Sequence, residues 1–391
     1  MKILVINYEY PPLGGGGGVF TKDLYEQIVK QGHPTTVVTS KYPGASEYEV
    51  LNGVEILRVP VLLRDQMAVA NLFSMLSYPP AAILKAVFNK RLRDYDVINT
   101  HFAVPSGPAG YILGKILRLP NILSVHGGDI FDPSKRLSPH RMAPLRQTVK
   151  MMIEKADCVV AQSCDTANNV RKYYTLPSRL ERIPLGIPRP VVQSKKRADF
   201  QIEKDDFVFC TIGRLVKRKN LEDALNALAM IKMDCRVKLL IIGEGPQKPH
   251  LQELIQKLDL KEQVRLLGSV SDEVKFQLLG ISDAYLSTAS HEGFGIVFLE
   301  AMAMGLPVIC YNRGGQTDFL RDGKTGFVVP LGDREILQNN MRSLIKDQEL
   351  QKKMAQNNLA AMADYYIESS ARQYINLFEE IITASANRNK K

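Results

Sequence analysis

The chain has 391 residues, of which 45% are hydrophobic and 24% are charged. This length accommodates two domains with separate hydrophobic cores, and the composition excludes a disordered or collagen-like chain. No apolar run reaches the roughly 18 residues that a membrane-spanning helix needs. The opening apolar run, residues 1–6, is too short for a signal peptide, so we interpret it as a first buried strand.

The net charge and the cysteines indicate which partners and which cellular compartment to expect. The formal net charge is +10, but the sequence has no RNP, zinc-finger or basic-zipper pattern, so we expect no nucleic-acid partner. An anionic membrane surface, an anionic substrate and an ordinary basic surface each account for the charge. The five cysteines are scattered without the paired spacing of a zinc site, which favours free thiols. We therefore expect a cytoplasmic protein and leave peripheral contact with the inner face of the membrane open.

Strand and helix patterns alternate along the first half of the chain. The run 3–6 predicts a strand, and an amphipathic pattern from about Val19 predicts a helix that Gly32 ends. Further strands are predicted, each ending at a polar or glycine-rich segment, at 35–39, 97–98, 122–125 and 158–161. A doubly wound parallel sheet places its ligand-binding loops at such positions.

The same alternation starts again in the second half. A helix is predicted over 221–230, and strands are predicted at 207–212, 237–242, 264–267, 284–286 and 308–310. The proline-rich and charged segment 186–197 between the two series is the best linker. We therefore predict an α/β protein of two Rossmann-like, doubly wound domains, 1–186 and 187–366, that face each other across a cleft.

The segment from Leu62 to Arg93 differs from the rest of the first domain. Apolar residues such as Phe73 alternate there with basic ones such as Lys85, Lys90 and Arg91, as in a basic amphipathic helix. Such a helix contacts a membrane or a lipid-linked acceptor, or it packs on its own sheet as an ordinary surface helix.

Five glycines, Gly14–Gly18, lie between the first strand and the first helix. Glycine lets backbone N–H groups approach a phosphate at a helix N-terminus, so Gly15 and Gly16 form a phosphate loop or a flexible turn. Val19 stands where the dinucleotide-binding pattern G-x-G-x-x-G requires its last glycine, and the P-loop pattern is absent. A nicotinamide-dependent dehydrogenase is therefore disfavoured.

Four cations follow the first strand of the second domain, in the segment Gly213–Asn220. Arg214 and Lys219 can converge on a diphosphate from two sides, one as a planar fork and the other as a point charge. Neutralising a leaving diphosphate is what glycosyl transfer without a metal requires. The alternative is a solvated basic turn.

Two glutamates in the segment 291–305 give the strongest signal. Glu292 precedes a glycine-rich turn, and Glu300 is the only charged residue between Glu292 and Arg313. Burying its carboxylate among apolar neighbours is costly unless a partner compensates it. The vicinal hydroxyls of a ribose or hexose would do so, and an internal ion pair with an arginine is the alternative.

Histidines follow two strands of the first domain. His126, with Gly127 and Gly128 after it, is expected to point into the crevice at the end of its sheet. It could orient a donor sugar or stabilise charge in the transition state. Asp129 contacts a ligand or caps a helix, and His101 is an acceptor-side group or a structural residue.

Together these motifs resemble the retaining glycosyltransferases of family 4, which have the GT-B fold. The resemblance covers nearly the whole chain, and its order and spacing make it specific. Its segments are Tyr10-Pro11-Pro12 with Gly15-Gly16, His126-Gly127, Gly213-Arg214-Leu215 with Lys219, Gly243-Glu244-Gly245-Pro246, Glu292 to Glu300, Gly305 to Val308, Gly314-Gly315 and Asp322 to Gly326.

The resemblance implies that the second domain binds a UDP- or GDP-sugar. Glu300 would hold the ribose hydroxyls, Arg214 and Lys219 would neutralise the diphosphate, and Glu292 would contact the hydroxyls of the donor sugar. His126 would lie near the reacting carbon. The residues implied in donor binding are Gly15, Gly16, Gly213, Gly243, Gly293, Phe294, Gly295 and Glu300, and those implied in catalysis are His126, Arg214, Lys219 and Glu292.

The resemblance also implies the reaction. A hexosyl group would move, with retention and without a metal or other cofactor, to a hydroxyl of a glycan, a lipid-linked intermediate or a small metabolite. The acceptor would bind in the first domain, on which the C-terminal helix, about 367–391, would pack. Two alternatives are a nucleotide-sugar 2-epimerase or hydrolase and a non-catalytic binding protein. The complete set of motifs argues against the second.

Overall fold

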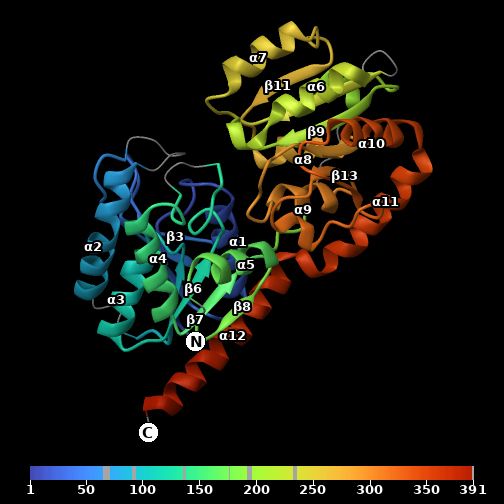
Figure 1. Cartoon of the computed structure of the whole chain (residues 1–391). Helices are drawn as coiled ribbons and strands as arrows, with labels where there is room; N and C mark the ends of the chain where they lie inside the picture. Colours follow the sequence, from blue (N-terminus) through green and yellow to red (C-terminus); the bar gives the residue numbers. More distant parts are fainter. Residues whose placement is uncertain are drawn as a thin grey trace. The chain divides into compact units, whose positions relative to one another are not determined.

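Two largely parallel β-sheets, one in each part of the chain, organise the fold (Figure 1). The computed structural model describes residues 1–64, 71–89, 94–134, 138–175, 177–191, 196–231 and 236–389. One unit consists of Met1–Pro188 and Tyr366–Lys391, and the other is Arg189–Tyr365. The division lies close to the predicted linker. The predicted pair of doubly wound α/β domains is thus present in the structure.

The sheet of the first unit has eight strands in the order β3-β4-β2-β1-β5-β6-β7-β8. All neighbours pair in parallel except β3 and β4, which are antiparallel. Its central strands are buried along their whole length, as expected where helices cover both faces of a parallel sheet. The strands are β1 (Ile3–Asn7), β2 (Thr35–Ser40), β3 (Tyr48–Leu51), β4 (Val54–Val59), β5 (Val97–His101), β6 (Asn121–Val125), β7 (Cys158–Ala161) and β8 (Leu180–Arg182).

Six α-helices lie within the described residues of this unit. The last of them, α12, comes from the C-terminal end of the chain and packs against α1, with Tyr374 and Phe378 buried (Figure 1). The side chains of Asn71 and Ser163 cap the N-termini of α2 and α5. The helices are α1 (Gly16–Lys30), α2 (Leu72–Phe88), α3 (Gly107–Leu117), α4 (Ala143–Lys155), α5 (Cys164–Tyr173) and α12 (Ile367–Asn389).

The sheet of the second unit is parallel throughout, with the order β11-β10-β9-β12-β13-β14. Its strands are β9 (Phe207–Ile212), β10 (Val237–Ile242), β11 (Val264–Gly268), β12 (Ala284–Ser287), β13 (Val308–Tyr311) and β14 (Gly326–Val329). Its α-helices are α6 (Leu221–Ile231), α7 (Lys248–Lys257), α8 (Asp272–Gly280), α9 (Ile296–Ala303), α10 (Arg334–Lys346) and α11 (Gln348–Ala361). Short 3₁₀ helices occur at Arg197–Phe200, Lys217–Lys219, Gly315–Asp318 and Met362–Tyr365.

Strand order reverses once in each sheet, and these reversals position the candidate site. The first unit reverses between β1 and β5, and the second reverses between β9 and β12. Loops diverge at such a switch point, so the carboxyl ends of the strands there form a crevice. His101 ends β5, while the glycine run, Gly213 and Glu292 follow β1, β9 and β12.

The start of the first helix differs from the prediction. α1 begins at Gly16 rather than near Val19, so Gly16 to Gly18 lie in its first turn. Glycine is a poor helix former, but close packing requires it here. A Cβ atom at Gly17 would lie 2.8 Å from the ring of Phe102. Packing against β5 and its following loop therefore outweighs the local helix propensity.

The helix α2 carries an unusual amount of exposed apolar surface. Phe73, Leu76 and Phe88 are among its exposed large side chains, and Phe88 is 79% exposed. In the described part of the chain, no helix combines the length and hydrophobicity needed to cross a bilayer. The basic residues Lys90, Arg91 and Arg93 that the sequence places after this helix lie outside the described residues.

Arg58, on β4, is a buried arginine with a compensating partner. Its side chain is 1% exposed, and its Nε and Nη2 atoms donate to Oε1 of Glu49 at 3.0 and 2.7 Å. Nη2 also donates to the carbonyl oxygen of Pro11 at 3.0 Å. We expect Arg58→Met to lower the free energy of unfolding by about 2 kcal/mol, because it removes charged hydrogen bonds and strands the carboxylate of Glu49.

Urea-induced unfolding followed by circular dichroism measures this loss. The control is Arg118→Met, which removes an equal charge from an exposed residue of the same unit that has no ion pair with a described residue. Equal unfolding midpoints for Arg58→Met and the wild type would contradict the prediction.

Candidate active site

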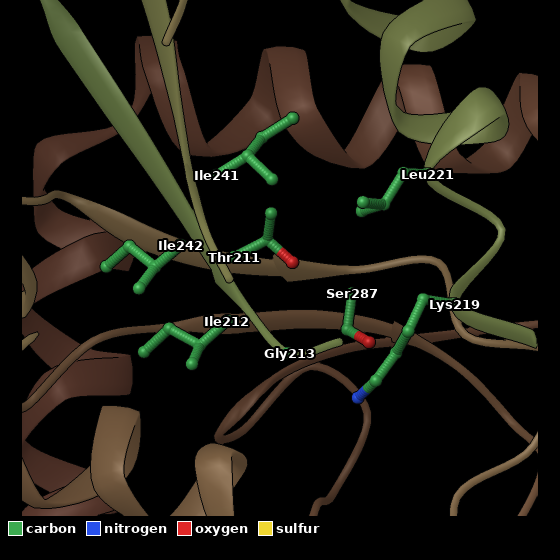
Figure 2. A pocket seen from close by; sticks show the side chains of 8 residues that line it. All are labelled: Thr211, Ile212, Gly213, Lys219, Leu221, Ile241, Ile242 and Ser287. Carbon is green, nitrogen blue, oxygen red and sulfur yellow. The ribbon is translucent and has the colours of Figure 1, made fainter. Parts of the chain in front are cut away.

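A small pocket lies at the carboxyl edge of the second sheet (Figure 2). The Lys219 side chain reaches into it across Gly213, which has φ +152°. A Cβ atom on Gly213 would lie 2.7 Å from Cε and 2.9 Å from Nζ of this lysine, so any larger residue would displace the ammonium group. The pocket is lined by Thr211, Ile212, Gly213, Lys219, Leu221, Ile241, Ile242 and Ser287.

Gly243 has a similar packing role at the end of β10. A Cβ atom there would lie 2.1 Å from the carbonyl oxygen of Gly213, and the N–H of Gly213 donates to Ile242 at 2.9 Å. The ends of β9 and β10 therefore approach each other more closely than any side chain would permit.

Glu292 lies buried between two cations at this edge. Its side chain accepts hydrogen bonds from Lys219 Nζ at 2.5 Å and from Arg218 Nη1 at 3.0 Å, and Arg218 also donates to the carbonyl oxygen of His291. Burial by itself would raise the pKa of Glu292, but Lys219 and Arg218 outweigh it and hold the pKa at about 2. The carboxylate is therefore ionised at neutral pH.

The backbone around Glu292 is held as firmly as its side chain. Its N–H donates to the carbonyl oxygen of Arg313 at 3.2 Å, and its carbonyl accepts from Gly315 at 2.9 Å. Gly293, Phe294 and Gly295 then form the turn into α9, with Gly295 immediately before its first residue. The Phe294 side chain is buried against Phe319, so this residue offers a ligand its main chain only.

Two further cations stand beside this cluster. Arg214 and Lys217 are exposed, and neither forms an ion pair with a residue that the structure describes. The turn therefore divides into two kinds of cation. Arg218 and Lys219 each donate a hydrogen bond to Glu292, while Arg214 can bind an anion from outside the protein.

Glu300 lies in α9 and is 9% exposed. Its Oε1 atom accepts from Lys275 Nζ at 2.7 Å, and Lys275, on α8, also contacts Asp272 at 2.8 Å. Burial would lower the pKa of Lys275, but the two carboxylates outweigh it and raise the pKa. The ion-pair alternative is therefore present in the structure, with a lysine in place of the expected arginine. The carboxylate keeps acceptor capacity for a hydroxyl, since each oxygen accepts more than one hydrogen bond.

The first unit brings His126, Gly15 and Gly16 into one region. Gly15 is the N-cap of α1, and a Cβ atom there would meet nothing within 4 Å, so space is open beside the helix N-terminus. A Cβ atom on Gly17 would lie 3.6 Å from His126 Nδ1. Burial lowers the pKa of His126 to about 4, so its imidazole is neutral at physiological pH.

Asp129 fastens the loop that carries His126. Its Oδ1 atom accepts from the N–H of His126 at 2.9 Å, and its Oδ2 atom accepts from the N–H of Ala103 at 2.7 Å. These bonds tie the loops after β5 and β6 together, and Asp129 lies in a turn rather than at the start of a helix, so the helix-cap alternative is wrong. His101 is fully buried, and both of its ring nitrogens have hydrogen-bond partners, as a structural residue would.

A chain of buried hydrogen bonds runs from β5 to His126. Tyr25 Oη lies 2.5 Å from Asn99 Oδ1 and 3.0 Å from His101 Nε2. His101 Nδ1 in turn lies 2.9 Å from His126 Nε2. Asn99 Nδ2 donates at 2.9 Å to the carbonyl oxygen of Ile122, which can only accept, so the orientation of the amide is determined.

The orientation of the Asn99 amide determines which atom donates the proton in each hydrogen bond of this series. Asn99 Oδ1 only accepts, so Tyr25 must donate its single proton to it and can only accept from His101 Nε2. Burial lowers the pKa of His101 well below its usual value, so its other nitrogen, Nδ1, is an acceptor for His126 Nε2–H. His126 Nδ1 is then unprotonated, and it has no hydrogen-bond partner among the described residues. It can accept a hydrogen bond but cannot donate one.

The predicted residues thus fall into two groups, each assembled within its own unit. The second unit brings together Gly213, Arg214, Lys219, Gly243 and the segment from Glu292 to Glu300, and the first unit brings together Gly15, Gly16, His101, His126 and Asp129. The sequence did not single out Arg218, Lys275, Tyr25 or Asn99. Of these, only Arg218 had a visible signal, since it lies in the basic turn itself.

Metal-binding groups are sparse in the described part of the chain, where no cluster of three or more His, Cys, Asp or Glu side chains could hold an ion. The one Asp-x-Asp triplet of the sequence is Asp94-Tyr95-Asp96. It immediately precedes β5, and Asp96 accepts a hydrogen bond from the backbone N–H of Lys2. The triplet therefore lies at the amino edge of the first sheet, opposite to the edge that carries His126.

The hydrogen-bond chain predicts a specific tautomer. In ¹⁵N spectra of protein labelled at its six histidines, His101 and His126 should both be neutral and carry their proton on Nε2. His126 should stay in this form down to about pH 4. A His126 signal with the proton on Nδ1 would contradict the assignment.

Tyr25→Phe removes the acceptor for His101 Nε2–H, so both tautomers of the histidine pair should then be populated. The matched control is Tyr78→Phe, because Tyr78 is equally buried and donates its hydroxyl proton to Val38 at 2.7 Å. The control should leave both histidine spectra unchanged.

Two family models match the chain, one over each half. The model for "Glycosyltransferase Family 4" matches residues 14–189, and the model for "Glycosyl transferases group 1" matches residues 192–360. The N-acetyl-alpha-D-glucosaminyl L-malate synthase of Bacillus anthracis is 27% identical, and the match covers 99% of each chain.

Solved structures show the same fold. Sucrose-phosphate synthase from Thermosynechococcus elongatus has a TM-score of 0.86 at 22% identity, over 98% of this chain and 100% of that one. Anabaena HepE in complex with UDP-glucose has a TM-score of 0.78 at 20% identity, over 97% of this chain and 100% of the HepE chain. The expected GT-B fold is confirmed. The chain belongs to the family 4 glycosyltransferases of the GT-B fold.

Proposed function

We propose that this glycosyltransferase moves a hexosyl group, with retention and without a metal, from a nucleotide diphosphate-sugar to a hydroxyl acceptor. The observation that carries the proposal is the buried Glu292 held between Lys219 and Arg218, with the exposed Arg214 beside it. Rigid cations at a strand edge suit a site where negative charge develops on a leaving diphosphate.

The roles of the donor-site residues follow from their positions. Arg214 and the remaining N–H groups of Lys219 neutralise the diphosphate, and Glu300 accepts hydrogen bonds from the ribose. Glu292 orients Lys219 and contacts the hydroxyls of the donor sugar. UDP is the first base to test, because the structurally similar HepE was solved in complex with UDP-glucose, although GDP stays open.

The state of the carboxylates disfavours retention through a covalent glycosyl-enzyme intermediate, whereas retention itself is what the family resemblance implies. Glu292 and Glu300 both lie in ion pairs, which makes each a poor nucleophile toward the anomeric carbon. Attack by the acceptor on the face that the diphosphate leaves, with a phosphate oxygen taking the hydroxyl proton, requires no carboxylate nucleophile. In the first unit, His126 Nδ1 accepts a hydrogen bond from a hydroxyl of the donor sugar.

The acceptor is assigned to the first unit as a glycan, a lipid-linked intermediate or a small metabolite. The exposed apolar side chains of α2 favour contact with a lipid-linked acceptor at a membrane surface. The relative from Bacillus anthracis favours a small metabolite, since its name states that it joins a glucosaminyl group to L-malate. The family and its relatives favour transfer over epimerisation, hydrolysis or non-catalytic binding.

The deciding experiment is a thermal-shift screen with UDP-, GDP-, ADP- and dTDP-sugars, with NAD and NADP alongside and EDTA throughout. A ligand that binds only the folded state raises the melting temperature by mass action. Stabilisation by one class of nucleotide sugar would support the proposal and name the base. A response to NAD alone, or to none of the sugars, would refute it. The anomeric configuration of the product, read by proton NMR, then tests retention.

Lys219→Ala should lower kcat by more than ~10²-fold, because it removes a charge that stabilises the leaving diphosphate. Single-turnover measurements with the donor identified by the screen would show the loss. Near-normal turnover would exclude this role for the lysine.

The control is Lys217→Ala, which removes the same charge two residues earlier from an exposed position that forms no ion pair within the described part of the chain. It should keep kcat within about twofold of the wild type, as surface substitutions away from a site usually have small effects. Melting temperatures of both variants separate a catalytic loss from a folding defect, since Lys219 also pairs with Glu292.

A further inference from the structure

Arg64 carries a buried positive charge for which the described residues offer no acidic partner. It is 5% exposed and follows β4, at the same edge of the sheet as Tyr8, which follows β1, and Ser40, which ends β2. Its guanidinium lies 4.5 Å from the centre of the Tyr8 ring. The arginine therefore reaches from an outer strand toward the switch point of the first sheet.

The hydrogen bonds of Arg64 leave one edge of the guanidinium unused. Nη1 donates to Ser40 Oγ at 3.3 Å, while Nε and Nη2 have no hydrogen-bond partner among the residues that the structure describes. The N–H groups of Nε and Nη2 point in the same direction from one edge of the planar group. Two parallel N–H donors match the two oxygens of a carboxylate or a phosphate.

Comparison with Arg58 shows that Nε and Nη2 of a buried arginine in this sheet can both be hydrogen-bonded. The same two atoms of Arg58, Nε and Nη2, both donate to Glu49. Arg64 is buried to a similar degree, but no carboxylate of the described part of the chain takes this place. A buried charge without a counter-ion is costly, so its retention indicates that another group supplies the missing charge.

We propose that Arg64 binds an oxyanion of the acceptor, either a carboxylate or a phosphate, through its Nε–Nη2 edge. The assignment of this anion to the acceptor rests on the proposed function, whereas anion binding itself does not. The substrate class is a hydroxyl compound that also carries a negative group. Such a compound is a hydroxy acid, a phosphorylated polyol or a lipid with a phosphate headgroup.

The test uses pairs of probes that differ only in the anionic group. Glycerol 3-phosphate is paired with glycerol, and L-lactate is paired with 1,2-propanediol, each titrated by thermal shift. Saturating UDP occupies the cations of the second unit during the titration. We expect one or both anions, and neither neutral compound, to raise the melting temperature of the wild type.

Arg64→Met should weaken binding of the anion by at least about tenfold, because it removes two charged hydrogen bonds. The affinity of Arg64→Lys for the anion should lie between those of the wild type and Arg64→Met, because lysine keeps the charge but lacks the two parallel N–H donors. Arg118→Met is the control for charge and should bind like the wild type. Equal affinity in Arg64→Met and the wild type, or no anion binding by the wild type, would overturn the proposal.

Stability gives an independent readout. Without ligand, Arg64→Met should unfold at a urea concentration no lower than the wild type, in contrast to Arg58→Met, because it removes an uncompensated charge. A loss as large as that of Arg58→Met would identify Arg64 as a structural residue and overturn the proposal.

A vesicle-binding experiment distinguishes a lipid headgroup from a soluble anion as the source of the negative group. Vesicles of phosphatidylcholine with and without phosphatidylglycerol are tested for binding in a flotation assay. Binding that requires both phosphatidylglycerol and Arg64 assigns a lipid headgroup, while a response to the soluble anions alone assigns a small acceptor. Failure of UDP to bind would exclude UDP as the donor nucleotide but leave the difference between Arg64→Met and the wild type interpretable.

Discussion

Parallel pairing of the strands is the constraint on which the rest of the structure depends. Parallel strands point their carboxyl ends toward one edge of the sheet, so residues far apart in the sequence meet there. In the second unit this edge joins the basic turn after β9 to Glu292 after β12. In the first unit it joins the glycine run, His101 and the loop of His126.

The two sheet edges differ in how their buried polar and charged groups are compensated. The second unit satisfies its buried charges internally, since Glu292 and Glu300 each have cations in contact. The first unit instead presents a neutral histidine with a determined proton position and an arginine, Arg64, with no counter-ion among the described residues. The proposed donor site is thus preorganised before a ligand arrives, whereas the proposed acceptor site would be completed by the ligand itself.

Much of this arrangement could be predicted from the sequence because it is local. Apolar runs that end at glycine or charge indicate the strands and their ligand loops, and Glu300 stands out as a lone charge in an apolar segment. The rest depends on contacts between distant segments. Tyr25 occupies a core position of an amphipathic helix, Lys275 comes from another helix, and Arg64 follows a strand like any polar loop residue. Single-sequence patterns contain no signal for such pairs. The start of α1 was predicted too late because close packing at Gly17 outweighs the low helix propensity of glycine.

The placement of α12 has a consequence for synthesis of the chain. Its side chains at Tyr374 and Phe378 belong to the core of the first unit, although the whole second unit precedes them in the sequence. Domains generally fold in the order in which the ribosome releases them. Here part of the apolar surface of the first unit stays uncovered until the whole second unit has been translated. Chaperones that shield nascent chains would therefore meet this surface while the second unit is being synthesised.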